Sequence, residues 1–298
     1  MGDYDEFSLL AGNAAEAGLE WFGPPPVQRR AVDVAGGRRV SALVWGAQPA
    51  SVVLLHGGAQ NAHTWDTVAL ALDRPLVAID LPGHGLSDWR DDHDYRPAAM
   101  ADDVGAAIEA LAPDASMVVG MSLGGLTTLE VADRRPELVR RLALIDITPG
   151  VNRFKAAGIV AFVGGPETFD SFDAILERTV TFNPGRTVAS LRRGVLHNAK
   201  ERPDGRWTWR YDRLRAEELI SGAAGDQLAR LWDVISGLRA PLLLVRGGRS
   251  PVVDDDDVAE LRRRRPDAEV VVVDDAGHSI QGDQPVALAL LLRSKVSP

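Results

Sequence analysis

Four short apolar runs in the first half of the chain predict buried β-strands. A continuous apolar run of this length is typical of a strand that is covered on both faces. The runs are Val52–Leu55, Leu76–Ile79, residues 117–119 and Leu142–Ile145. Before them, Val27–Val34 and Arg38–Trp45 alternate between apolar and polar positions on either side of a glycine pair, which predicts an edge hairpin.

Amphipathic stretches between and after these runs predict helices. The clearest covers Pro97–Leu111, where Met100, Val104 and Ile108 lie on one stripe. Further helices are expected at residues 126–133, 255–264 and 284–293, and further strands at residues 241–245 and 270–273. Because strands and helices alternate, right-handed crossovers are expected. The sequence therefore predicts an α/β fold, a mostly parallel twisted sheet with helices on both faces.

The alternation stops at residues 151–235, where no run resembles a buried strand. This interruption predicts an inserted, mainly helical cap. The α/β core is therefore expected at residues 27–150 and 236–298. Residues 1–26 form an N-terminal extension with one expected helix, which the three prolines at residues 24–26 would end.

Composition and charge narrow the class of protein. Of the 298 residues, 45% are hydrophobic and 25% are charged, which is ordinary for a folded globular chain. The absence of cysteine excludes disulfides, a cysteine nucleophile and thiolate metal sites, and no metal or cofactor is expected. The formal net charge of −9 disfavours nucleic acid and anionic membranes as partners.

The chain is expected to be cytoplasmic. No apolar stretch approaches the roughly 18 residues of a membrane-spanning helix, and acidic residues stand at the start, where a signal peptide needs basic ones. The expected partner is a small-molecule substrate, and the expected state is a monomer or a homodimer.

A glycine-rich turn places Ser122 between the expected strand at residues 117–119 and the expected helix at residues 126–133. Gly120 and Gly124 flank Ser122 in the pattern G-x-S-x-G. Between a strand and a helix, this pattern predicts a nucleophile elbow, a sharp turn whose flanking positions have no room for side chains. The helix N-terminus beneath Ser122 favours negative charge there.

A second glycine-rich segment follows the strand Val52–Leu55. Its residues His56-Gly57-Gly58 let main-chain N–H groups approach a ligand closely. The N–H groups of Gly58 and Leu123 are therefore candidates for an oxyanion hole. The side chain of His56 is expected to be a core histidine bonded to a loop carbonyl.

His278 is the candidate general base. It follows the expected strand at residues 270–273 and comes last in the chain order of serine, acid and histidine. A base for Ser122 needs a pKa near neutrality, which an unperturbed histidine already has. The other histidines are expected to be solvated or satisfied by hydrogen bonds; besides His56 they are His63, His84, His93 and His197.

These motifs resemble those of the α/β-hydrolase superfamily over roughly residues 27–296. The resemblance rests on four segments in the superfamily's order: residues 56–58 (HGG), 80–87 (DLPGHGLS), 120–125 (GMSLGG) and 277–278 (GH). It implies an α/β-hydrolase fold in which Ser122, an acid and His278 form a catalytic triad. It does not define the substrate, because this scaffold hosts many chemistries.

The acid of this triad departs from the superfamily's common pattern. In most relatives it follows the strand after the cap, where this chain has Ser250. The first candidate is Asp146, directly after Leu142–Ile145, because some relatives carry their acid there. The second is one of the four aspartates at residues 254–257, although acidic residues at a helix start also satisfy free N–H groups. A chain without a triad acid is the third possibility.

Aromatic residues concentrate in the expected cap. Next to a catalytic cleft, they suggest an apolar pocket for the acyl or alcohol group of a substrate. The alternative is that each one packs in the cap's own core. The candidates for the pocket are Phe154, Phe162, Trp207 and Trp209.

The leading functional hypothesis is a serine hydrolase of the carboxylic ester type. It would cleave an ester, lactone or thioester of a small, largely apolar substrate through an acyl-enzyme. Carbon–carbon bond hydrolysis and cofactor-free perhydrolysis would use the same triad and are alternatives. A non-catalytic ligand-binding protein on the same scaffold is the alternative from another class.

Overall fold

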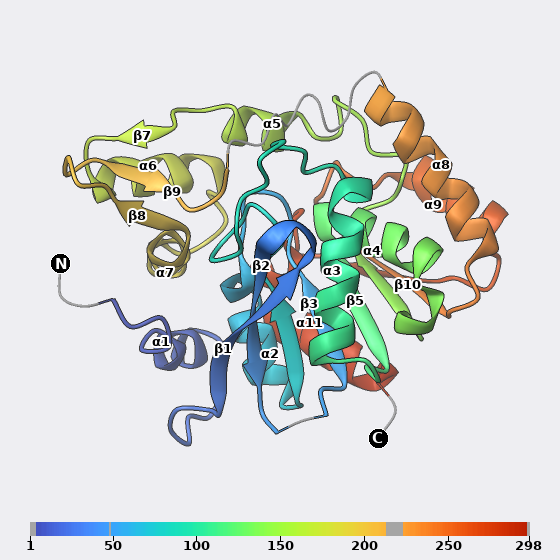
Figure 1. Cartoon of the computed structure of the whole chain (residues 1–298), viewed down its shortest axis with the longest axis horizontal. Helices are drawn as coiled ribbons and strands as arrows, with labels where there is room; N and C mark the ends of the chain where they lie inside the picture. The colour runs from blue at the N-terminus through green and yellow to red at the C-terminus, as the bar shows by residue number, and fades with distance from the viewer. Residues whose placement is uncertain (1–3, 48, 213–222, 297–298) are drawn as a thin grey trace.

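A sheet of eight strands forms the centre of the computed structural model, which describes residues 4–47, 49–212 and 223–296. The strands are β1 (Val27–Val34), β2 (Arg38–Trp45), β3 (Val52–Leu55), β4 (Leu76–Ile79), β5 (Met117–Met121), β6 (Leu142–Ile145), β10 (Leu242–Gly247) and β11 (Glu269–Val273). Their order is β1-β2-β4-β3-β5-β6-β10-β11 (Figure 1). The predicted hairpin of β1 and β2 is antiparallel, as is the pair of β2 and β4, and the other neighbours are parallel.

Helices cover both faces of this sheet (Figure 1). One face carries α1 (Leu10–Glu16), α2 (Asp66–Leu72), α10 (Ile280–Asp283) and α11 (Pro285–Lys295). The other face carries α3 (Pro97–Leu111), α4 (Leu123–Arg134), α8 (Ala223–Gly237) and α9 (Asp255–Arg264). Short 3-10 turns lie at Ala35–Gly37, Ala62–Trp65 and Pro136–Leu138.

The four apolar runs form strands that are covered on both faces, as the sequence predicts. Every residue of β3, β4, β5 and β6 is buried, because these strands lie inside the sheet and helices cover both of their faces. The predicted α/β fold, with its mostly parallel sheet, is therefore confirmed.

The described residues between β6 and α8 form a lobe beyond the carboxyl ends of the parallel strands, drawn in yellow-green to gold in Figure 1. Its helices are α5 (Ala157–Val163), α6 (Phe172–Phe182) and α7 (Val188–Asn198). Three short strands pair antiparallel in the order β7 (Thr168–Phe169), β9 (Trp207–Trp209), β8 (Ala199–Glu201). Although residues 223–235 fall within the expected cap, α8 packs against α4, and Arg230 forms ion pairs with Glu130 and Asp133 there.

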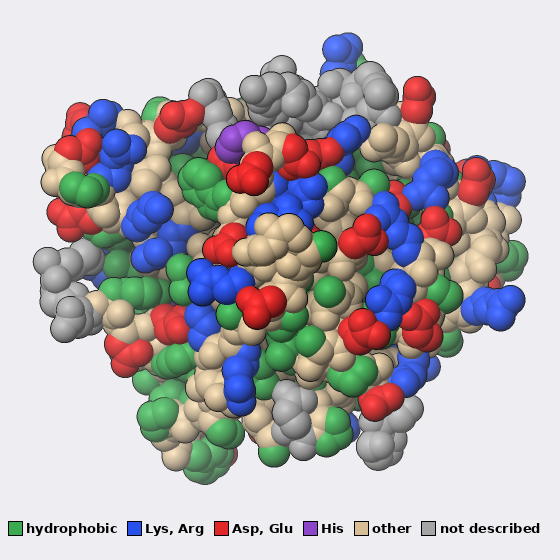
Figure 2. Space-filling model, viewed as in Figure 1, with side chains coloured by type: hydrophobic (Ala, Val, Ile, Leu, Met, Phe, Trp, Pro, Cys, Tyr) green, Lys and Arg blue, Asp and Glu red, His purple; other side chains and the backbone are tan. Residues whose placement is uncertain are grey.

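Charged side chains of both signs are intermixed on the face in Figure 2. Ion pairs also join α3 to the end of α4, where Arg134 pairs with Asp102 and Arg135 with Glu109, each at 2.9 Å. Within the described residues, no helix is both long enough and apolar enough to cross a membrane.

Candidate active site

The turn between β5 and α4 holds Ser122 in a strained backbone conformation. Its φ of 50° and ψ of −119° lie in a region that side chains other than glycine rarely adopt. A Cβ atom on Gly120 would lie 2.5 Å from the Cα of Gly125, and one on Gly124 would lie 2.5 Å from the carbonyl oxygen of His56. The turn can therefore close only with glycine at both positions, as the nucleophile-elbow motif predicts.

His278 and Asp146 come together although 132 positions separate them in sequence. The Nδ1 atom of His278 lies 2.8 Å from Oδ2 of Asp146. Asp146 is fully buried directly after β6, and His278 follows β11. Both strands are parallel to β10, which lies between them, so their carboxyl ends meet at the same edge of the sheet.

Ser250 supports this pair. The main-chain N–H of Gly247 donates to Oδ1 of Asp146 at 2.8 Å, and the hydroxyl of Ser250 donates to Oδ2. Ser250 stands where most relatives have the acid, as the resemblance indicates. In this chain the carboxylate comes from the neighbouring strand, and the residue at the usual position donates a hydrogen bond to it.

The aspartates at residues 254–257 have other partners. Asp254 caps α9, where it accepts from the N–H of Asp257 at 3.0 Å, while the side chain of Asp257 accepts from the N–H of Asp254. Lys155 lies 2.9 Å from Asp254 and 2.7 Å from Asp257, and Asp255 pairs with Arg246. These contacts fit the helix-start interpretation of the acidic run.

The predicted oxyanion segment lies beside Ser122. A Cβ atom on Gly57 would lie 3.2 Å from Cβ of Ser122, and Gly58 lines the same cavity as Ser122. Leu123 is the first residue of α4, so its N–H has no acceptor within the helix.

The side chain of His56 is fully buried. Its Nδ1 lies 2.7 Å from the carbonyl oxygen of Gly57, and its Nε2 accepts from the N–H of Leu81. Burial lowers the pKa of His56, so its ring stays neutral and holds this loop.

A cavity of about 980 Å³ joins the core and the lobe at this point. Ser122 and His278 line it from the core side. Two of the four predicted pocket residues, Phe162 and Trp209, line it from the lobe. Phe182 also lines the cavity and contacts Phe162 with ring centres 5.4 Å apart, but the sequence did not single it out.

The other two predicted pocket residues lie away from the cavity lining. Trp207 packs against Phe172 inside the lobe, with ring centres 5.1 Å apart. Phe154 is 76% exposed, with the Arg153 guanidinium 4.7 Å above its ring. The structure does not bring these two residues to the cavity lining, because aromatic content alone does not tell which face of an insertion a side chain occupies.

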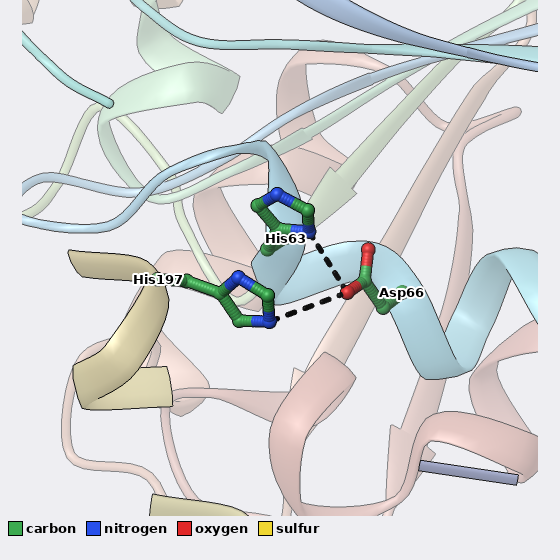
Figure 3. A group of neighbouring side chains, drawn as sticks. All are labelled: His63, Asp66 and His197. Atoms are coloured by element: carbon green, nitrogen blue, oxygen red, sulfur yellow. Dashed lines mark hydrogen bonds and ion pairs between the residues drawn. The ribbon is translucent and has the colours of Figure 1, made fainter. Parts of the chain in front are cut away.

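A buried cluster of His63, Asp66 and His197 borders the same cavity (Figure 3). His63 Nδ1 lies 2.9 Å from Asp66 Oδ2, and His63 Nε2 lies 3.0 Å from Oε2 of Glu6. His197 stacks on His63 with ring centres 3.8 Å apart, and its Nδ1 lies 2.5 Å from the Tyr4 hydroxyl. The cluster therefore connects the N-terminal segment, the 3-10 turn at Ala62–Trp65 with the start of α2, and the lobe helix α7.

The protonation state of this cluster follows from its charges. Burial alone would lower the pKa of His63, but the carboxylates of Asp66 and Glu6 outweigh it and raise the pKa to about 9. His63 is thus a cation at neutral pH. Burial, together with that charge, holds the pKa of His197 well below its usual value. Burial would raise the pKa of Glu6, but hydrogen bonds from His63 and Arg29 lower it to about 2.

The same three side chains offer a metal ion three ligand atoms within 4.8 Å of one another. However, both ring nitrogens of His63 face carboxylates, and the two rings lie 12° from parallel. The in-plane lone pairs of stacked rings run side by side and do not converge at a tetrahedral angle. The described side chains therefore fit a charged hydrogen-bond network better than a metal site.

This network predicts a specific dependence of stability on pH. The pKa of His63 is higher in the folded chain than its ordinary value, so its stabilisation is fully present below about pH 6.5 and is lost as pH rises through about 9. We expect Glu6→Gln to lower the melting temperature at pH 7, by an amount that corresponds to about 1–2 kcal/mol, and to flatten its fall between pH 7 and 9.5.

Thermal melts of the wild-type chain and this variant across that range would measure the effect. Glu20→Gln, at an exposed acid of the same segment, is the matched control and should follow the wild type. Parallel curves for Glu6→Gln and the wild type would contradict the assigned charge on His63.

Comparisons with known proteins identify the family of this chain. Residues 50–285 match the family model of the alpha/beta hydrolase fold, so the chain belongs to the α/β-hydrolase family. It is 46% identical over 296 residues to the esterase Rv0045c of Mycobacterium tuberculosis, covering 97% of this chain and 95% of that protein. It is 29% identical to a 3-hydroxybutyrate-oligomer hydrolase of Cupriavidus necator, covering 87% of this chain and 93% of that one.

Solved structures show the same likeness. A structure of the M. tuberculosis esterase Rv0045c superposes with a TM-score of 0.86 at 44% identity, covering 99% of each chain. The structure of an E-2-(acetamidomethylene)succinate hydrolase gives a TM-score of 0.77 at 25% identity, covering 90% of this chain and 98% of that one. The family that the motifs indicated is therefore confirmed.

Proposed function

We propose that this protein is a serine hydrolase that cleaves carboxylic esters through an acyl-enzyme. The observation that carries the proposal is the contact between the buried Asp146 and the partly buried His278, which lines one cavity together with a serine on a strained turn. The esterase that is 46% identical over nearly the whole chain supports the ester hydrolase class. No relative named above favours carbon–carbon hydrolysis, perhydrolysis or a non-catalytic role.

The proposed chemistry assigns one role to each group. The Ser122 oxygen attacks the carbonyl carbon while His278 Nε2 takes its proton, and Asp146 accepts from Nδ1–H and stabilises the imidazolium. The N–H groups of Gly58 and Leu123 stabilise the oxyanion. His278 then gives the proton to the leaving alcohol, and water, activated by the same histidine, releases the carboxylic acid and restores Ser122.

The apolar part of a substrate would lie against the aromatic side of the cavity. Phe162, Phe182 and Trp209, which line the cavity, provide this surface. A cytoplasmic location, a monomeric or homodimeric state and the absence of a metal or cofactor stay predictions from the sequence.

Labelling with a fluorophosphonate tests the proposed nucleophile directly. We expect one covalent adduct per folded chain, located on Ser122 by peptide mass spectrometry, because His278 would activate this serine. His278→Gln should slow the labelling at least about 1,000-fold, since the serine then loses its proton acceptor. Urea-unfolded protein is the control and should not be labelled. An adduct on another residue, or none on folded protein, would contradict the proposal.

A further inference from the structure

Arg186 is a lobe residue that reaches the cavity of Ser122 and His278. It lies in the loop between α6 and α7, where its main-chain N–H donates to the carbonyl of Asn183. A Cβ atom on Gly282 would lie 2.8 Å from Nη1 of Arg186. Because Gly282 is in α10, four positions after His278, the guanidinium lies beside the segment that carries the candidate base.

The positive charge of Arg186 is only partly compensated. Nη2 donates to the Ser190 hydroxyl at 2.7 Å, while Nε is enclosed and has no hydrogen-bond partner. Among the described residues, no carboxylate forms an ion pair with this guanidinium. A charge withdrawn from water without a counter-charge is costly, and burial accordingly lowers the pKa of Arg186.

The acidic groups whose charge acts on Arg186 are occupied elsewhere. Asp283 accepts from the N–H of Gly277 at 2.8 Å. Glu16 accepts from Arg193 and from the Thr187 hydroxyl. Arg186 therefore has nearby negative charge but no direct acid partner.

The two other guanidinium groups at the cavity differ in this respect. Arg193 donates to Asn13 at 2.6 Å and pairs with Glu16. Arg249 donates to the main-chain carbonyl of Asp275. Among these three arginines, Arg186 is thus the one whose donor Nε is enclosed and unused.

We propose that Arg186 binds a carboxylate of the substrate, so that the preferred substrates are esters with a free carboxylate remote from the scissile bond. The fork of a guanidinium matches a carboxylate, and pairing with its terminal nitrogens would neutralise the charge. The aromatic wall of Phe162, Phe182 and Trp209 would hold the chain between the two ends. This inference rests on the proposed ester hydrolysis and narrows it to one substrate class.

Paired esters of equal chain length test the assignment. We expect the wild-type enzyme to show a higher kcat/KM for mono-p-nitrophenyl adipate than for p-nitrophenyl hexanoate, which has a methyl group in place of the carboxylate. Arg186→Gln should lower kcat/KM for the adipate ester about 10- to 100-fold, mainly through KM, and change the hexanoate value less than about threefold. Acetate release from 4-acetoxybutyrate and from its methyl ester provides the same comparison with the carboxylate on the alcohol side.

Arg202→Gln is the matched control, because it removes the same charge from a lobe arginine outside the cavity lining, at 3.4 Å from Asp204. It should leave both members of each ester pair unchanged. A parallel loss on charged and neutral esters in Arg186→Gln, or a wild-type enzyme without preference for either charged ester, would overturn the inference and leave ester hydrolysis in place.

Binding of free adipate, measured by calorimetry, separates this inference from the proposed function. Arg186→Gln should weaken adipate binding at least about 10-fold, and Arg202→Gln should not. This result would support the carboxylate site even if neither ester were cleaved, in which case the proposed hydrolysis alone would fail. Equal adipate affinity in the wild type and Arg186→Gln would contradict the site.

Discussion

Ser122→Ala should lower kcat toward p-nitrophenyl butyrate by about 10,000- to 1,000,000-fold. Without the hydroxyl no acyl-enzyme can form, and the remaining rate comes from substrate binding, the oxyanion donors and a water molecule. Alanine tolerates the φ of 50° no worse than serine, so the fold should persist. Steady-state assays on protein free of host esterases, together with the melting temperature, would measure both effects.

A serine at a distant position gives the control for this substitution. Ser294→Ala removes an exposed hydroxyl of α11 that donates to the carbonyl of Leu291, and it should leave kcat unchanged. If Ser122→Ala kept more than a few per cent of the wild-type rate at an unchanged melting temperature, Ser122 would not be the nucleophile.

The meeting of the candidate catalytic residues at one edge of the sheet was predictable, because each motif follows a predicted strand. The segments that hold Gly58, Ser122, Asp146 and His278 come after β3, β5, β6 and β11, which are parallel within the sheet. Parallel strands have their carboxyl ends at the same edge of the sheet. Motifs that directly follow such strands therefore lie close together in space. The structure adds that Ser250 donates to Asp146. From the sequence, Ser250 was recognisable only as a serine at the position where most relatives have the acid.

The lobe and the N-terminal segment were less predictable. Phe154 and Phe162 are both aromatic, yet one is exposed and the other lines the cavity, because the direction of a side chain depends on tertiary packing. The contact of Tyr4 with His197 joins positions 193 residues apart, and no local pattern encodes it. His63 was expected to be solvated or satisfied, and it is satisfied by two carboxylates. Nothing in the sequence singled out Arg186 as a binding residue, because its lack of an acid partner depends on how the chain folds.

Asp146→Asn should lower kcat about 10,000-fold while the chain stays folded. An amide has nearly the same shape as the carboxylate, but it cannot stabilise the imidazolium and can hold His278 in the wrong tautomer. Asp146 also accepts from Gly247 and Ser250, so we expect a lower melting temperature as well. Circular dichroism at the assay temperature would show that the lost activity is not lost structure.

Two further variants distinguish the acid candidates. Asp254→Asn removes the N-cap carboxylate of α9; it should cost stability of about 0.5–2 kcal/mol but change kcat less than about threefold. Ser250→Ala removes one donor to Asp146 and should lower kcat by about 10-fold, a loss between those expected for Asp254→Asn and Asp146→Asn. Because the carboxylate that orients His278 must contact its ring, a large loss in Asp254→Asn with full activity in Asp146→Asn would move the acid to the start of α9. The 2.8 Å contact of Asp146 with Nδ1 predicts the opposite order.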